Sequence, residues 1–160
     1  MNEKGISLLE LIIYIAVFSV VSIVMIQIFL VVLRGRDIAN VRFEVSQNMR
    51  FATEKIRQAV FDAFSIVVSG SCPLNTLDIT TGSATSSFFI SGNILKFSNA
   101  SGTSDITTNK IIATTTPSDC LFSIISNSAP AKSTLQAKLK IVYNNEDGIS
   151  ESQQITVSLR

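Results

Sequence analysis

The stretch MNEKGISLLELIIYIAVFSVVSIVMIQIFLVVLRGR (residues 1–36) decides the fold, because it contains the longest uncharged run of the chain. From Leu11 to Leu33 there are 23 consecutive uncharged residues. A helix of that length is about 35 Å long, whereas the hydrocarbon core of a bilayer is roughly 30 Å thick. We therefore expect a membrane-spanning helix over residues 6–33.

A cleaved secretory signal is the main alternative for this run. The apolar region of such a signal is typically about 7–15 residues long and ends at small residues. Here the run is longer, and Arg34-Gly35-Arg36 follows it. A retained span is therefore favoured. The positive-inside rule leaves its orientation open, because Arg34 and Arg36 oppose Lys4 and the amino terminus.

A glycine and a glutamate precede the main body of the run. Gly5 is followed by Ile6 and, five positions after the glycine, by Glu10. The stretch Lys4-Gly5-Ile6-Ser7-Leu8-Leu9-Glu10, with a long apolar helix behind it, resembles the prepilin leader of type IV pilins and type II secretion pseudopilins. In that family a membrane peptidase cuts after the glycine and methylates the new amino terminus.

The resemblance implies a leader of residues 1–5, cleavage between Gly5 and Ile6, and N-methylation of Ile6. It also implies a cytoplasmic leader, so that a single-pass chain in the inner membrane carries its carboxyl-terminal part outside the cytoplasm. The partners implied are other pilin or pseudopilin subunits, the prepilin peptidase, the inner-membrane assembly platform and membrane lipid.

Glu10 requires a physical reason, because a charged side chain at the bilayer centre costs roughly 2.5 kcal/mol or more. In a filament of packed helices, the amino terminus of a neighbouring subunit can supply the opposite charge and set the axial register of the two helices. Alternatively, Glu10 lies in the headgroup zone, where the helix dipole favours an acidic residue. With Gly5 at the family's spacing, we expect Glu10 to act in assembly.

Residues 34–68 are predicted to form an amphipathic stalk, continuous with the span as one helix over residues 6–67. Glu54 is spaced to pair with Arg50 or Arg57 on its exposed face. The apolar stripe can pack on a sheet or form a coiled-coil dimer, and its small alanines favour the sheet. The stripe recurs at steps of three or four residues: Ile38, Val41, Val45, Met49, Ala52, Ile56, Ala59, Val60, Ala63 and Phe64.

Residues 69–160 are predicted to form a β-rich head. Ser91-Gly92-Asn93 is typical of a hairpin turn, and the alternation in the last 26 residues predicts an antiparallel hairpin. The Ser/Thr-rich stretches Thr80–Ser87 and Ser98–Thr108 are expected to be loops. The predicted class is α+β and pilin-like, with one long helix on an antiparallel sheet. The strands are expected at Thr76–Thr80, Ser87–Ser91, Ile94–Ser98, Lys110–Thr115, Leu121–Ser126, Leu135–Tyr143 and Gln153–Leu159.

The composition argues against catalysis, and we expect no enzyme, cofactor or metal. The chain has no histidine, which removes triad chemistry and most transition-metal sites. Glu146 and Asp147 could help to bind calcium, but a solvated turn is favoured. Cys72 and Cys120 lie too far apart for a compact metal motif, and a structural disulfide is expected outside the cytoplasm. The net charge of +1 predicts no direct nucleic-acid binding.

The expected function is that of a structural minor subunit of a type IV pilus-like or type II secretion filament. Major pilins often carry a helix-breaking proline about 22 residues into the mature chain, where this sequence has Gln27. A helix without that weak point suits a rigid initiating complex. The alternative is a membrane-anchored extracytoplasmic binding or adhesion protein that does not polymerise.

Overall fold

The computed structural model describes residues 8–116, 119–125, 133–144 and 148–159. The chain divides into two compact units, residues 1–40 and 41–160. We call residues 8–40 the amino-terminal segment and residues 41–160 the folded unit. The expected cleavage and methylation site, Gly5 and Ile6, lies outside the described residues, as do Glu146 and Asp147.

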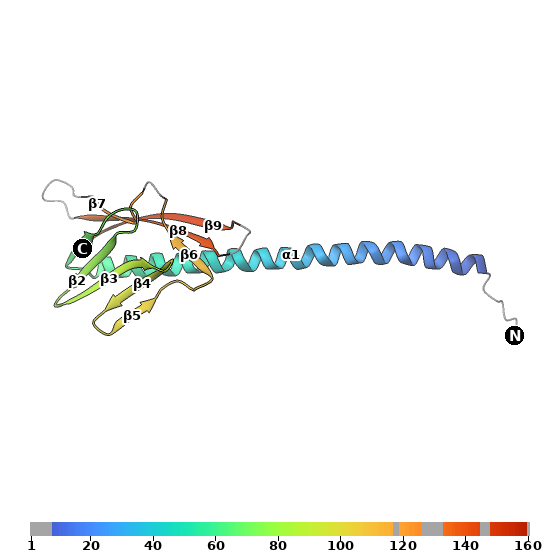
Figure 1. Ribbon diagram of the computed structural model, residues 1–160, viewed down its shortest axis with the longest axis horizontal. Coiled ribbons are helices and arrows are strands. Elements are labelled where there is room, and N and C mark those ends of the chain that lie inside the picture. The colour runs from blue at the N-terminus through green and yellow to red at the C-terminus, as the bar shows by residue number, and fades with distance from the viewer. Residues whose placement is uncertain (1–7, 117–118, 126–132, 145–147, 160) are drawn as a thin grey trace. The chain divides into compact units, whose positions relative to one another are not determined.

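One helix, α1 (Leu8–Phe61), accounts for all of the described amino-terminal segment and for the first part of the folded unit (Figure 1). It is long and apolar enough to cross a membrane. The helix contains no proline, and it continues through Gly35, which is its one glycine. The predicted fold, a long amino-terminal helix packed on antiparallel β-sheet, is confirmed.

The predicted carboxyl end of this helix is wrong. The sequence predicts a helix that reaches Val67 and a stalk that reaches residue 68. In the structure, α1 ends at Phe61, and strand β1 occupies Ser65–Ser69. The three consecutive β-branched residues of β1 favour extended backbone. The N–H of Phe64 donates to the carbonyl of Thr80 at 2.8 Å, so the chain enters the sheet at once.

Sheet A is a five-stranded antiparallel sheet with its strands in chain order. The turn between its third and fourth strands is the predicted one, because Gly92 and Asn93 both have positive φ, as a type I′ turn requires. The loops expected at Thr80–Ser87 and Ser98–Thr108 instead contain strand residues, since small hydroxyl side chains fit an exposed pleated face. The strands are β1, β2 (Thr76–Thr81), β3 (Ala84–Ser91), β4 (Ile94–Asn99) and β5 (Gly102–Asp105).

Sheet B is built around one long strand, β8. Strand β9 pairs along one side of β8, and the short strands β6 and β7 pair with opposite ends of it. The predicted carboxyl-terminal hairpin is therefore confirmed as β8–β9. The strands are β6 (Ile111–Thr114), β7 (Phe122–Ile125), β8 (Thr134–Tyr143) and β9 (Ser150–Ser158).

The core of the folded unit joins α1 to both sheets. The predicted stripe supplies Val45, Met49, Ala52, Ile56, Val60 and Ala63 to it, all buried. Phe64, by contrast, is 85% exposed, because the helix has ended before it. The stripe thus packs on the sheets, as predicted. Its largest fully buried partners are Leu77, Ile79, Phe88 and Leu95 of sheet A and Ile111, Phe122, Leu135 and Ile141 of sheet B.

Candidate functional site

Glu10 lies in the first turn of α1 as the structure describes it. The hydroxyl of Tyr14 donates to its Oε1 atom at 3.4 Å, a long hydrogen bond between side chains four residues apart. Both side chains are exposed. The carboxylate is therefore presented on the helix surface, among apolar side chains, where a positive group from another molecule can reach it.

The amino-terminal segment offers an apolar surface around Glu10. Every residue from Leu8 to Asn40 is exposed except Ser22, which is half-buried. Contiguous apolar surface on this scale marks a contact with membrane or with another protein. The hydroxyl of Ser19 bonds the carbonyl of Ile15 at 2.7 Å, so even this polar side chain is satisfied within the helix. The segment is suited to lipid or to other helices.

A buried amide attaches α1 to the loop before β6. The Oδ1 atom of Asn48 accepts from the N–H of Thr108 at 3.1 Å, and its Nδ2 atom donates to the carbonyl of Glu44 at 2.8 Å. The Glu44 carboxylate lies 3.8 Å from Lys110 Nζ. Asn48 falls three residues after Val45 and four before Ala52, so it is a polar residue within the apolar stripe. That interruption of the stripe is the sequence signal for the contact, although it does not show which loop Asn48 would bind.

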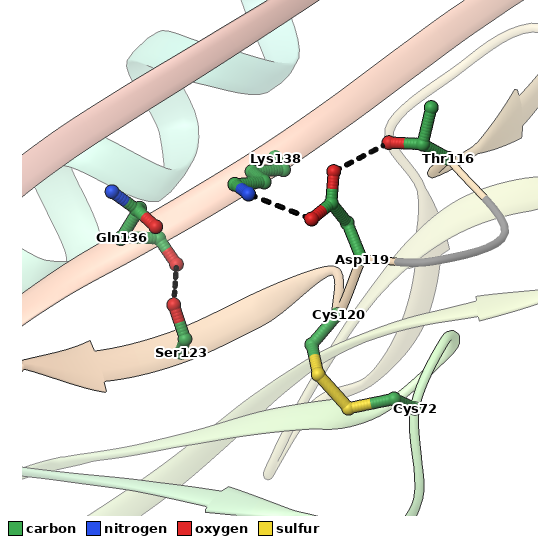
Figure 2. Close-up of polar contacts among 7 residues, drawn as sticks. All are labelled: Cys72, Thr116, Asp119, Cys120, Ser123, Gln136 and Lys138. Atoms are coloured by element: carbon green, nitrogen blue, oxygen red, sulfur yellow. Dashed lines mark hydrogen bonds and ion pairs between the residues drawn. A yellow bond between two sulfur atoms is a disulfide. The ribbon is translucent and has the colours of Figure 1, made fainter.

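Cys72 and Cys120 form a disulfide, the pairing expected from the sequence (Figure 2). It is one part of an inter-sheet seam, which joins residues 72–75, between β1 and β2 of sheet A, to residues 120–122, at the start of β7. The N–H of Leu121 donates to the carbonyl of Pro73 at 2.9 Å. The seam holds the two sheets together through main-chain and side-chain bonds as well as the covalent one.

Asn75 completes the seam, and sequence reasoning did not find it. Its side chain is buried; Nδ2 donates to the carbonyl of Phe122 at 2.7 Å, and Oδ1 accepts from the N–H of Phe122 at 2.9 Å. The amide thereby makes the two hydrogen bonds that a neighbouring strand would make to this residue. It satisfies two main-chain groups that would otherwise be costly to bury. No short-range pattern points to a bond across 47 positions.

An ion pair lies beside the disulfide (Figure 2). Asp119 accepts a 2.8 Å bond from Lys138 Nζ and a 2.7 Å bond from the hydroxyl of Thr116. These bonds favour the charged form and hold the pKa of Asp119 below its usual range, the Lys138 bond most strongly. A carboxylate held anionic in this way stabilises structure and is poorly suited to proton transfer near neutral pH.

Within the described ranges, no three His, Cys, Asp or Glu side chains are grouped so that they could hold a metal ion. The comparisons with known proteins are also negative: no family model, curated protein or solved structure matches this chain. Two features of the described residues therefore bear on function. One is the exposed, apolar amino-terminal segment with Glu10, and the other is the pair of sheets in the folded unit.

Proposed function

We propose that this chain is a structural minor pilin or pseudopilin, a low-copy subunit of a type IV pilus-like or type II secretion filament. The observation that carries the proposal is the spacing of Gly5 and Glu10 immediately before a long apolar helix. The exposure of the amino-terminal segment supports it, because apolar side chains on all sides of a helix need lipid or other helices around them.

In this proposal, removal of residues 1–5 leaves Ile6 as a methylated, positively charged amino terminus. Glu10 of one subunit pairs with that charge on a neighbour as the helices pack side by side. The pairing is stronger in a low-dielectric surrounding than in water, and it allows only one axial offset between the helices. The folded unit is then carried on the extracytoplasmic side, and partner proteins drive assembly with ATP.

The minor rank is supported by the regularity of α1. The described part of residues 6–33 is helical throughout and contains neither proline nor glycine. An interior proline would remove a main-chain hydrogen bond and create a weak point. A helix without such a point suits a rigid initiating complex better than a long extensible fibre.

Processing is the first test. Intact mass of the protein from its native host should lack residues 1–5 and carry one methyl group on Ile6. Gly5→Val should block cleavage, whereas Gly35→Ala should be processed normally, because a methyl group there meets no atom within 4 Å. If the wild type occurs only with residues 1–5 retained, the proposal fails and the non-polymerising anchored binding protein replaces it.

Glu10→Gln tests assembly separately from processing. It should leave thermal unfolding of the folded unit unchanged and strongly reduce incorporation into filaments. Ser19→Ala is the matched control, since it alters an exposed polar side chain of the same helix. Quantitative mass spectrometry of sheared filaments measures both variants. The same measurement on wild type tests rank, because a minor subunit cannot be the most abundant protein there.

A further inference from the structure

A polar surface cavity of about 450 Å³ adjoins strands β8 and β9 of sheet B. Lys138 of β8 is paired with Gln154 of β9, and Lys140 is paired with Ser152. Residues paired in this way share one face of a sheet. Ile141, the next residue of β8, is buried in the core, so the two lysines lie on the opposite, outer face. They and their two β9 neighbours form one wall of the cavity.

The connection between β6 and β7 supplies the other wall, with Thr115, Thr116 and Asp119. Asp119 accepts hydrogen bonds from Lys138 and from Thr116 (Figure 2). The carboxylate of Asp119 and the ammonium of Lys138 are 2.8 Å apart and neutralise each other. This ion pair therefore leaves neither group in need of a charged ligand.

Among the described residues, Lys140 is the cation of this cavity that lacks an ion-pair partner. Its side chain is half-buried. Glu151 of β9 is paired with the buried Ile141, so it lies on the core-facing side of the sheet and not beside Lys140. Because Lys138 and Asp119 compensate each other, the charged side chains that line the cavity sum to one positive charge.

Thr115 adds an unpaired polar group to the same cavity. The residue is buried, and its Oγ1 atom makes no hydrogen bond with any described residue. A buried hydroxyl without a partner is costly, and an acceptor bound against this wall would supply the partner. An ammonium can only donate, and a hydroxyl can also donate, so one oxyanion can accept from both Lys140 and Thr115.

We propose that the cavity binds the carboxylate of a small hydroxylated acid. A carboxylate carries one negative charge, which matches the uncompensated charge of Lys140, whereas a doubly charged phosphate would be repelled by Asp119. Ser152 and Gln154 offer hydroxyl and amide groups that both donate and accept, as the hydroxyl groups of such a ligand do. The volume lies within the range of small-molecule sites. The inference rests on sheet B alone and is independent of the proposed role of the amino-terminal segment.

A nuclear magnetic resonance titration of the full chain in detergent, at constant ionic strength, tests the ligand. D-glucuronate carries a carboxylate on a hydroxylated ring, D-glucose lacks the carboxylate, and acetate lacks the ring. D-glucuronate should shift the amide signals of Thr115, Thr116 and Ser152 saturably, with a Kd in the millimolar range, and leave those of sheet A unchanged. Acetate should bind about tenfold or more weakly, and D-glucose should not saturate.

Each probe can overturn one part of the proposal. Shifts by D-glucuronate that do not saturate, or that lie outside the cavity, would overturn the site. Equal binding of D-glucose would overturn the carboxylate, and equal binding of acetate would overturn the hydroxylated body. Tighter binding of inorganic phosphate would contradict the match to a single charge.

Lys140→Gln tests the charged donor. It should raise the Kd for D-glucuronate about tenfold or more, because a hydrogen bond to a charged group is lost. Lys55→Gln removes the same charge outside the cavity and should leave the Kd unchanged. Thermal unfolding checks that the variants are folded. An unchanged Kd in folded Lys140→Gln would overturn the proposal.

Thr115→Val provides a second variant, which removes the hydroxyl at nearly constant shape. It should weaken the binding of D-glucuronate several-fold, since one donor is lost. Thr116→Val is the matched control, because the hydroxyl of Thr116 is already bonded to Asp119. Thr115→Val decides the matter if Lys140→Gln does not fold. An unchanged Kd in Thr115→Val would then overturn the proposal.

Discussion

The amino-terminal segment and residues 41–61 belong to the same helix, yet their apolar side chains differ completely in burial. Met25 is 64% exposed, whereas Met49 is fully buried. The amino acid and the secondary structure are the same in both places, so the difference comes from what the rest of the chain supplies. Residues 41–61 are covered by two sheets, and the amino-terminal segment requires an apolar surrounding from outside the chain.

The two regions also differ in pattern. Residues 11–33 are apolar on every side, as suits contact with lipid and other helices. Residues 41–61 carry their apolar side chains on one side and charges such as Glu54 and Arg57 on the other, where the two form a 2.8 Å ion pair. The distribution of apolar and charged residues therefore predicts which part of α1 packs against other elements of the same chain.

Removing the disulfide should have the largest effect on stability, and only in the folded unit. Cys72 and Cys120 are separated by 48 positions, and a loop of that size corresponds to about 4 kcal/mol in the chain-entropy model. The double variant Cys72→Ser/Cys120→Ser should lose about that much in urea unfolding measured in detergent. The helical signal of the amino-terminal segment should persist. Its simultaneous loss would contradict the separation between the two regions.

The two methionines give a matched pair of substitutions in one helix. Met49→Ala leaves a cavity between α1 and the sheets and should cost about 2–5 kcal/mol of unfolding free energy. Met25→Ala removes the same atoms from an exposed position and should leave that free energy unchanged. Chemical denaturation of both variants measures the contrast. Similar losses would mean that residues 8–40 also pack on the folded unit.

Two asparagines of α1 provide a smaller, polar contrast. Asn48→Ala removes the buried amide that accepts from the N–H of Thr108 and donates to the carbonyl of Glu44, and should cost about 0.5–1.5 kcal/mol per lost bond. Asn40→Ala changes an exposed side chain of the amino-terminal segment and should be nearly neutral. Thermal unfolding distinguishes them. A neutral Asn48→Ala would show that the amide is not needed to attach α1 to the loop.

The smallest expected effect depends on pH. The folded-state pKa of Asp119 is lowered from 3.8 by Lys138 and Thr116, so its stabilising contribution is present above that value and disappears as the pH falls through the folded pKa. The difference in melting temperature between wild type and Asp119→Asn should therefore be full at neutral pH and shrink below about pH 4. Asp37→Asn, in the amino-terminal segment, should show no such change. A constant difference across this range would rule out the Asp119–Lys138 contact as its source.

The parts of the fold that depend on short-range pattern were predictable. Helical periodicity placed Met49 and Ile56 in the core, and the Gly92-Asn93 turn followed from residues that tolerate positive φ. The end of α1 was not predicted, because Ala63 and Phe64 continue the helical spacing although the chain has already turned toward β1. The helical spacing shows which residues are apolar. It does not show where the β-branched residues of β1 begin to pair with the next strand.

The division into two sheets and the inter-sheet seam could not be predicted in the same way. Asn75 and Phe122 are bonded across 47 positions, and neither residue type signals the contact. Likewise, the pairing of β6 and β7 with opposite ends of β8 depends on how the intervening chain returns to the sheet. At the proposed assembly site, the spacing of Gly5 and Glu10 is a short-range pattern that the sequence shows directly, whereas the role in assembly that we infer from it stays a prediction.

The inter-sheet seam has a consequence for the order of events during biogenesis. The bonds of Asn75 with Phe122, and of Leu121 with Pro73, need no oxidant, and they bring residues 72–75 against residues 120–122. A chain that folds in the reduced state would therefore already hold its two thiols side by side, with the Cα atoms near their 4.7 Å separation. Oxidation then follows folding, and the seam acts by bringing the thiols together; because the chain has two cysteines, there is no competing intramolecular pair for a disulfide-shuffling catalyst to correct.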